Sequence, residues 1–470
     1  MDIQYSDKER AILKKIGEAA KETGIPCYVT GGFVRDKILN RDTKDIDIVC
    51  IGDGIHLANN VAALLTPSPM VSFFKNFGTA QIITGDKEIE FVGARRESYN
   101  YDSRKPVVEP GTLENDQDRR DFTINAMAIS LNESDYGTLI DPFNGINDLE
   151  NRIIKTPLDP RVTFNDDPLR MMRAIRFAAQ LNFIIEPLTL ESVKSNASRI
   201  KIVSGERIAD ELNKILMSKK PSVGFNLLYT TGLLDIIFPQ MTALVGAEYI
   251  DGKGHKDNFY HTLQVLDNIS EKTNDLWLRW SSVLHDIGKP KTKKFEAGHG
   301  WTFHGHEITG GRMVPKIFFQ LKLPQNDKMK FVRKMVELHL RPISLTKDTI
   351  TDSAIRRLLF DAGEDFDALM ILCEADITSK NKLKVKQYLE NFEIVRQRCA
   401  EVEEKDHMRN WQPPVSGEMI MQQFNLPPGR MIGVLKNAIR DAILDGEIAN
   451  DYNAAHEFLL IKAQELGINT

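Results

Sequence analysis

The chain has 470 residues, with 61 Lys and Arg against 66 Asp and Glu, a formal net charge of −5 at pH 7 and a pI near 6.1. Its length exceeds what one ordinary core fills and predicts two to four domains. Because the net charge is negative, any nucleic-acid partner must be held by local basic clusters, since a globally positive surface is excluded.

The cysteines and the lack of a long apolar stretch indicate the cellular compartment of the protein. Cys27, Cys50, Cys373 and Cys399 have no metal-type spacing, and the first two lie in apolar runs, which predicts reduced core residues. The N-terminus lacks a basic segment followed by an apolar one, and no stretch approaches the roughly 20 apolar residues that span a bilayer. We therefore expect a cytoplasmic protein without a membrane partner.

Up to about residue 150, helical and strand-like stretches alternate, which predicts an α+β domain built on a small mixed sheet. Turns such as Gly85-Asp86 separate the strands. The predicted helices are Lys8 to Thr23, Phe33 to Leu39 and Ile55 to Leu65, and the predicted strands are Pro26 to Thr30, Asp45 to Ile51, Thr79 to Thr84 and Glu88 to Ala94.

From Asp166 onward the strand signals fade and helical periodicity predicts a mostly helical remainder. A loop-like stretch with three glycines, Gly246 to Asn258, precedes a region rich in histidine. The predicted domains are a head at 1–150, a helical neck and body at 151–250, a histidine-rich helical domain at 251–400 and a helical tail at 401–470.

The first motif places two carboxylates after a glycine pair. In a strand, residues two apart share a face, so Asp45 and Asp47 point together while Ile46 points into the core. Carboxylates side by side repel, and a divalent cation between them is the simplest resolution. Gly31 and Gly32 let the backbone turn tightly beside a polyanion, near the beginning of a helix. The alternative is that Asp45 and Asp47 belong to a solvent-exposed strand end and bind no metal.

A third carboxylate is expected from a neighbouring strand. Lys87 to Val92 offers two candidates on one face, of which we favour Glu90 over Glu88. Three carboxylates suffice for two metal ions, one activating a hydroxyl and one neutralising a triphosphate and its pyrophosphate product.

The second motif runs from Asp118 to Ala128. At helical spacing Asp121 and Asn125 lie on one side, and Arg119 and Arg120 lie where guanidinium groups would bind phosphate oxygens. The alternative is a helix cap with a solvated basic pair.

The third motif begins a helix at Pro168, with Asp167 and Arg170 three residues apart on one face. A carboxylate accepts from the exocyclic amine of cytosine or adenine, while an arginine donates to the adjacent ring nitrogen. Guanine and uracil have the opposite polarity and would leave buried groups unpaired. The pair therefore predicts a site that admits C and A, unless it is an ordinary intrahelical salt bridge.

Together these motifs resemble the bacterial (class II) tRNA CCA-adding enzymes and poly(A) polymerases of the polymerase β superfamily. The resemblance covers residues about 25 to 215, and its most specific string runs from Arg119 to Ala126. It implies a polymerase β-like nucleotidyltransferase head with Mg²⁺ on Asp45 and Asp47. The implied nucleotide-binding residues are Gly31, Gly32, Arg35, Arg119, Arg120, Asp121, Asn125, Asp167, Arg170 and Arg173.

The same resemblance implies a neck that selects CTP and ATP without a nucleic-acid template, and a body and tail that grip tRNA. One departure is visible: the selector motif of the family usually begins Glu-Asp, and here Asp166 precedes Asp167. The shorter side chain leaves the base-selecting pair Asp167 and Arg170 intact but weakens the expectation of a supporting role for Asp166.

The second half carries His261, the doublet His285-Asp286, and Asp376, in that order. Imidazoles and carboxylates that converge in a helical core need a metal to offset their burial. The run resembles the HD phosphohydrolase superfamily, which implies one or two divalent ions, Mg²⁺ or a transition metal. His306 and His339 are candidates for a second ion site. The alternative is a degenerate domain kept as structural body.

The leading hypothesis is an enzyme that adds C, C and A to tRNA 3′ ends, with a second activity on phosphomonoesters, cyclic phosphates or nucleotides at the HD residues. The nearest alternative is a poly(A) polymerase or A-adding enzyme, against which the modest pI weighs. A third hypothesis is an HD phosphohydrolase whose head binds RNA without catalysis, and a fourth is an RNA-binding scaffold.

Overall fold

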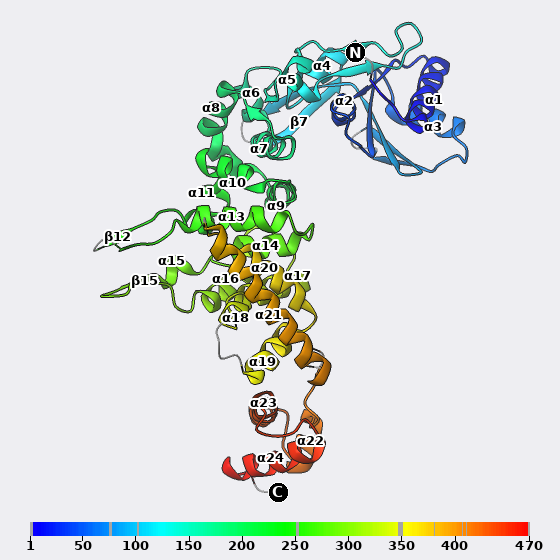
Figure 1. Cartoon of the computed structure of the whole chain (residues 1–470). Helices are drawn as coiled ribbons and strands as arrows, with labels where there is room; N and C mark the ends of the chain where they lie inside the picture. The colour runs from blue at the N-terminus through cyan, green and yellow to red at the C-terminus, as the bar shows by residue number, and fades with distance from the viewer. Residues whose placement is uncertain are drawn as a thin grey trace. The chain divides into compact units, whose positions relative to one another are not determined.

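The computed structural model describes residues 3–74, 78–100, 103–250, 253–345, 351–379, 381–406, 408–409 and 411–468. The chain divides into two compact units, Met1–Thr242 and Ala243–Thr470, which are described separately. Figure 1 shows the long strands in the blue and cyan part of the chain, and mainly helices in the green to red part. The predicted α+β class is confirmed.

The first unit is built on a seven-stranded sheet with the order β3-β4-β5-β2-β1-β8-β9. The central strands β2 and β5 are parallel, and every other neighbouring pair is antiparallel. The strands are β1 (Cys27–Thr30), β2 (Asp45–Cys50), β3 (Val71–Phe74), β4 (Thr79–Thr84), β5 (Lys87–Gly93), β8 (Ala128–Ser130) and β9 (Leu139–Ile140).

Apolar and acidic residues alternate along β2, which gives the strand a buried apolar face and a polar face. Ile46 and Ile48 are fully buried, whereas Asp45 is exposed and Asp47 is half-buried. The helix α3 (Gly54–Leu64) packs against the sheet, the helix α1 (Asp7–Thr23) packs against α3, and the short helix α2 (Gly32–Ile38) follows β1. The predicted head elements therefore form, and each of their bounds lies within one residue of the prediction.

An ion cluster anchors α1 to the sheet. The buried Glu9 carboxylate lies 2.7 Å from the ammonium of Lys37 and 2.8 Å from that of Lys87, which also donates to the Thr43 carbonyl at 2.7 Å. Burial opposes the Glu9 charge, but the two lysines outweigh it and lower the pKa of Glu9 to about 2. One carboxylate thus pairs with two ammonium groups.

Replacing Glu9 with Gln should lower the free energy of unfolding of the first unit by about 3 kcal/mol at pH 7, because both lysines lose a buried partner. The lowered pKa means that this contribution is complete above about pH 4.5 and is lost as the pH falls through 2. The four tryptophans all lie beyond residue 242, so hydrogen exchange of β5 peptides is the suitable measurement. Glu18→Gln, which loses a surface pair with Lys15, is the control and should leave stability nearly unchanged.

The rest of the first unit is a two-stranded ribbon followed mainly by helices. The ribbon pairs β6 (Arg95–Asn100) with β7 (Ser103–Pro110), and β10 (Ile153–Ile154) pairs in parallel with β11 (Ile184–Ile185). The helices are α4 (Leu113–Asp118), α5 (Gly145–Glu150), α6 (Pro160–Asp166), α7 (Leu169–Leu181), α8 (Pro187–Asn196), α9 (Gly205–Leu216), α10 (Pro221–Thr230), α11 (Leu233–Ile237) and α12 (Pro239–Thr242), with 3₁₀ turns at Thr123–Asn125 and Ala197–Ile202.

The second unit is helical, as predicted, but it carries two hairpins that the sequence did not predict. They pair β12 (Tyr249–Ile250) with β13 (Lys253–Gly254), and β14 (Lys294–Glu296) with β15 (Gly300–Thr302). Within the stretch predicted as a loop, Asp251 and Gly252 lie outside the described residues. The helices are α13 (Asn258–Ser270), α14 (Leu276–Leu284), α15 (Lys289–Thr292), α16 (His306–Gln320), α17 (Asp327–Leu338), α18 (Arg341–Ser344), α19 (Asp352–Ala362), α20 (Phe366–Ala375), α21 (Lys382–Asp406), α22 (Gly417–Phe424), α23 (Arg430–Asp445) and α24 (Tyr452–Glu465), with a 3₁₀ turn at Gly363–Asp365.

The four cysteines are buried and free, as expected for reduced core residues. Across the described ranges, no helix combines the length and the apolar character that crossing a lipid bilayer requires.

Candidate functional site

A cleft of about 560 Å³ in the first unit gathers most of the residues predicted for nucleotide chemistry. Of that predicted set, the lining includes Gly31, Gly32, Arg35, Asp47, Glu90, Arg119, Arg120, Asp121, Asn125, Asp167, Arg170 and Arg173. Asp45 is not among the lining residues, since it is exposed at the first position of β2. Residues from three predicted motifs therefore share one cavity.

The carboxylates of the cleft come from the two parallel strands at the centre of the sheet. Asp47 of β2 is in register with Glu90 of β5, and Asp45 is in register with Glu88. Burial, with the neighbouring Asp45, raises the pKa of Asp47 against the opposing effect of Arg120. Burial, with Asp47, raises the pKa of Glu90. Charges that raise one another's pKa form a set that a divalent cation would stabilise.

Gly31 approaches this set so closely that only glycine fits. Its backbone has φ of 72°, in the left-handed region, and a Cβ there would lie 2.8 Å from both the Asp47 carboxylate and the Arg120 guanidinium. The glycine pair thus brings the main chain against the acidic strand.

Two arginines of the second motif are held by an acidic residue that sequence reasoning missed. Asp116, fully buried in α4, accepts from Arg119 and, at 3.0 and 2.9 Å, from Arg120. Burial alone would raise the pKa of Asp116, but Arg120 and Arg119 hold it below its usual value. Arg120 also donates to the hydroxyl of Thr30 at 2.8 Å. The spacing of three and four residues on one helix was the signal available in the sequence.

Asp121 and Asn125 do lie together, but not on a helix: Asn125 ends a 3₁₀ turn and Asp121 precedes that turn. Asn125 donates to Asp121 at 2.9 Å and accepts from Arg35 at 2.8 Å, while Arg173 of α7 donates to Asp121 at 2.7 Å. Arg173 and the Asn125 amide outweigh the effect of burial and lower the pKa of Asp121 to about 2. Asp121 therefore fixes Asn125 and Arg173 directly, and Asn125 in turn holds Arg35.

The third motif joins two helices. Asp167 ends α6 and its carboxylate accepts from the backbone N–H of Leu169, while Pro168 caps the start of α7. Arg170 donates to the carbonyl of Arg119 at 2.5 Å, which links the second motif to the third. Asp166 lies outside the cleft and lines a smaller neighbouring cavity of about 200 Å³.

The lining also includes residues that were not predicted as site residues, among them Arg176, Phe177, Gln180 and Arg207. Arg35 and Arg176 lie over the Phe177 ring, with guanidinium carbons 4.9 and 4.3 Å from its centroid. The one-turn spacing of Arg173, Arg176 and Gln180 on α7 was a usable signal. Arg207, on α9, is brought in by tertiary packing alone.

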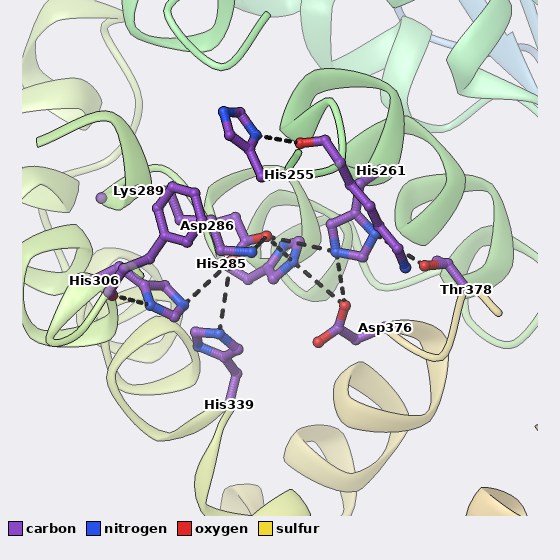
Figure 2. A network of polar contacts seen from close by, with 12 residues as sticks. His255, His261, His285, Asp286, Lys289, His306, His339, Asp376 and Thr378 are labelled. Atoms are coloured by element: carbon purple, nitrogen blue, oxygen red, sulfur yellow. Dashed lines mark hydrogen bonds and ion pairs between the residues drawn. The ribbon is translucent and has the colours of Figure 1, made fainter. Parts of the chain in front are cut away.

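The second unit holds the other predicted cluster, shown in Figure 2. The Nε2 atom of His261 lies 2.9 Å from the Asp376 carboxylate and 3.5 Å from that of Asp286. Nε2 of His285 and of His306 each lies 3.2 Å from Asp286, and Nε2 of His339 lies 4.0 Å from it. All six predicted residues converge, with Asp286 at the centre.

The imidazole rings are held from behind by the main chain. Nδ1–H of His285, His306 and His339 donates to backbone carbonyls at 2.7, 2.8 and 2.7 Å, so Nε2 is the ring nitrogen that faces Asp286. Among the described residues, these three buried Nε2 atoms have no hydrogen-bond partner. Orphaned nitrogens that face a carboxylate fit a metal site.

Two groups have the spacing of metal ligands, His261 with His285 and Asp286, and Asp286 with His306 and His339. Asp286 belongs to both. Its pKa is held well below its usual value by His285, against the effect of burial, and Asp286 in turn raises the pKa of His285 to about 9. Burial and His285 lower the pKa of His339 to about 4, so that ring is a neutral ligand at pH 7.

Comparison with family models divides the chain into three matched segments. The poly(A) polymerase head domain matches residues 27–155, a probable RNA and SrmB-binding site of polymerase A matches 182–244, and the HD domain matches 258–381. Domains of the first and third kinds are typically metal-dependent, in accord with the two carboxylate-containing sites.

Individual proteins with similar sequences or structures have names that agree with these family matches. An A-adding tRNA nucleotidyltransferase of Deinococcus radiodurans is 32% identical over 361 residues, covering 74% of this chain and 79% of the relative. A multifunctional CCA protein of Pseudomonas fluorescens is 30% identical over 381 residues, covering 77% and 87%. A solved tRNA nucleotidyltransferase in complex with a primer tRNA and an incoming ATP analog is 26% identical, with a TM-score of 0.55, covering 81% and 99%.

Proposed function

The chain belongs to the tRNA nucleotidyltransferase and poly(A) polymerase family, and from this premise we propose that it adds C, C and A to the 3′ ends of tRNA. The substrates are CTP and ATP, and pyrophosphate is released. The observation that carries the proposal is the single cleft in which strand carboxylates face a set of fixed arginines and a base-reading pair. On this proposal the head spans 1–150, the neck and body 151–250, the HD domain 251–400 and the tail 401–470.

Asp45 and Asp47 would hold Mg²⁺ in the head, with Glu90 assisting. Bound Mg²⁺ supplies charge neutralisation at the triphosphate and a lowered pKa of the attacking 3′ hydroxyl. Arg119 and Arg120, fixed by Asp116, bind phosphate oxygens. The 3′ oxygen bonds to the α-phosphorus, the bond to the β-phosphate oxygen breaks, and pyrophosphate leaves with that electron pair.

A second set of contacts would select the base. Asp167 and Arg170 line the cleft near the beginning of α7, and Arg170 is braced on the Arg119 carbonyl. Asp121 holds Arg173 and Asn125 beside them. Protein groups fixed in this way would replace a nucleic-acid template.

Replacing Asp167 with Ala should lower the discrimination of CTP and ATP against UTP and GTP by about 10- to 100-fold, because the acceptor for the exocyclic amine is lost. The measurement is kcat/KM for each nucleotide on a tRNA primer. Asp166→Ala, outside the cleft, is the control and should keep the preference. Unchanged selectivity in Asp167→Ala would assign base reading to other residues.

Single-nucleotide resolution of products decides between full and partial addition. A tRNA lacking CCA, incubated with Mg²⁺, CTP and ATP, should be extended by three residues and stop. One addition that uses only ATP, on a primer ending in CC, would make it an A-adding enzyme, the activity named for the Deinococcus radiodurans relative. A long ATP-only ladder would make it a poly(A) polymerase.

A second activity is favoured by the His and Asp cluster, which we propose to be a metal-dependent phosphohydrolase centre. His261, His285, Asp286 and Asp376 would hold one divalent ion, and His306 and His339 a second, shared through Asp286. A transition metal suits the imidazole-rich set, with Mg²⁺ as the alternative. Bound metal supplies a water of lowered pKa. Hydrolysis of a phosphate ester by the loaded protein, lost on metal removal, is the test.

A further inference from the structure

Thr30 is a buried polar residue behind the nucleotide cleft that has no part in the nucleotidyl transfer proposed above. It is the last residue of β1, it is 1% exposed, and it is in register with Asp47 of β2. A buried hydroxyl is costly unless it has a hydrogen-bond partner. The partner of the Thr30 hydroxyl is the guanidinium of Arg120.

The guanidinium of Arg120 is fixed on one side and open on the other. Its Nη2 donates to the Thr30 hydroxyl at 2.8 Å and pairs with the Asp116 carboxylate at 2.9 Å, and its Nε donates to the same carboxylate at 3.0 Å. Its Nη1 makes a longer contact of 3.5 Å with the carbonyl of Asn125. Thr30 and Asp116 therefore fix Nε and Nη2, and Nη1 is the nitrogen available to a phosphate oxygen in the cleft.

The open side of Arg120 lies next to a second carboxylate, that of Asp47. A Cβ on Gly31 would lie 2.8 Å from Nη1 of Arg120 and 2.8 Å from a carboxylate oxygen of Asp47, so the two groups are neighbours across the glycine. Among the described residues, the carboxylate that pairs with Arg120 is nevertheless that of Asp116. If Arg120 turned onto Asp47, the cleft would lose a carboxylate that can hold a metal and a guanidinium that can bind a triphosphate.

We propose that Thr30 is a positioning residue that holds Arg120 away from Asp47 and toward the triphosphate. The inference rests on the nucleotidyl transfer proposed above, and it names the residue that keeps the cation and the metal-binding carboxylate apart before the substrates arrive. Without the hydroxyl, a guanidinium N–H would lose its buried partner, and pairing with Asp47 would satisfy it. Thr30 is not one of the described residues that line the cleft, so its effect passes through Arg120.

Calorimetry of ATP binding to the full-length protein in EDTA tests the proposal without metal or turnover. Thr30→Val should weaken ATP binding about tenfold, because Arg120 is drawn from the triphosphate, and Thr30→Ser, which keeps the hydroxyl, should bind ATP as the wild type does. Adenosine, which has no phosphate, should bind equally to all three proteins. Thr189→Val is the matched control, since it removes a buried hydroxyl that donates to Glu186 at 2.8 Å, outside the cleft.

The Mg²⁺ dependence of primer extension is the second measurement. Thr30→Val should need about tenfold more Mg²⁺ for half-maximal extension of a tRNA lacking CCA, because Arg120 then competes with the metal for Asp47. Its kcat at saturating Mg²⁺ and nucleotide should stay close to that of the wild type, since the reacting groups are unchanged.

A double variant tests where Arg120 turns. In Asp47→Asn the attracting charge is absent, so the addition of Thr30→Val should weaken ATP binding in EDTA by less than about twofold. Tenfold weakening in both backgrounds, unchanged ATP binding by Thr30→Val, or an equal loss in Thr30→Ser overturns the proposal. If the wild type extends no tRNA, the nucleotidyl transfer function fails, and ATP binding in EDTA alone then decides the role of Thr30.

Discussion

Replacing Asp47 with Asn should lower incorporation of both CMP and AMP by about 1,000-fold or more, because one of the two carboxylates that would hold Mg²⁺ is lost. Asp47 is in register with Glu90 and lines the cleft, so its carboxylate faces the place where a triphosphate fits among the arginines. The measurement is the single-turnover rate of extension on a tRNA primer.

A measurement of stability distinguishes the loss of a metal ligand in Asp47→Asn from misfolding of the variant. Burial raises the pKa of Asp47, so the ionised carboxylate disfavours the folded state at neutral pH and is least costly when protonated. The Asn variant should therefore be at least as stable as wild type in EDTA. Glu88→Gln, on the exposed neighbouring position of β5, is the matched control and should retain near-normal incorporation. Incorporation by Asp47→Asn within tenfold of wild type would refute the metal role.

Replacing Asp286 with Asn should empty both metal groups of the second unit and lower phosphohydrolase activity by about 1,000-fold, while CCA addition is retained. The reason is that Asp286 is the one residue common to the two candidate ligand groups. Metal content measured by elemental analysis should fall from about two ions to none.

Two further variants serve as comparisons for Asp286→Asn. His339→Asn removes a ligand from one group alone and should leave one ion bound. His299→Asn changes an exposed histidine outside both groups and should keep both ions. Retention of two ions by Asp286→Asn would contradict the shared-ligand arrangement.

Much of the head could be predicted because its signals are local. Alternation of Asp45, Ile46 and Asp47 with buried neighbours defines a half-buried strand, and the structure has that strand between β1 and β5. The glycine pair and the acidic strand could be read as one site because they are close in the chain. The order of His, His-Asp and Asp in the second unit was similarly informative, and these side chains do converge.

The rest depends on tertiary contacts. Asp116 has a local spacing to its two arginines, but only tertiary packing buries it and so distinguishes it from an ordinary surface ion pair. Arg207 was missed because only packing brings α9 to the cleft. The turn at Thr123–Asn125 has helical spacing but only 3₁₀ length. The hairpins β12–β13 and β14–β15 have strands of two or three residues, too short for period-two alternation to stand out.

The carbonyls behind His285, His306 and His339 bear on how the centre is supplied with metal. Since the main chain sets the orientation of these rings, we expect the second unit to fold with its candidate ligands in place before an ion binds. If the proposed centre binds an ion, that ion would then be decided by competition among the divalent metals available in the cell, whose intrinsic affinities rise from manganese to copper. Growth conditions and purification buffers would therefore select the metal. Differences in phosphohydrolase activity between preparations would then reflect the metals to which each was exposed as well as the sequence.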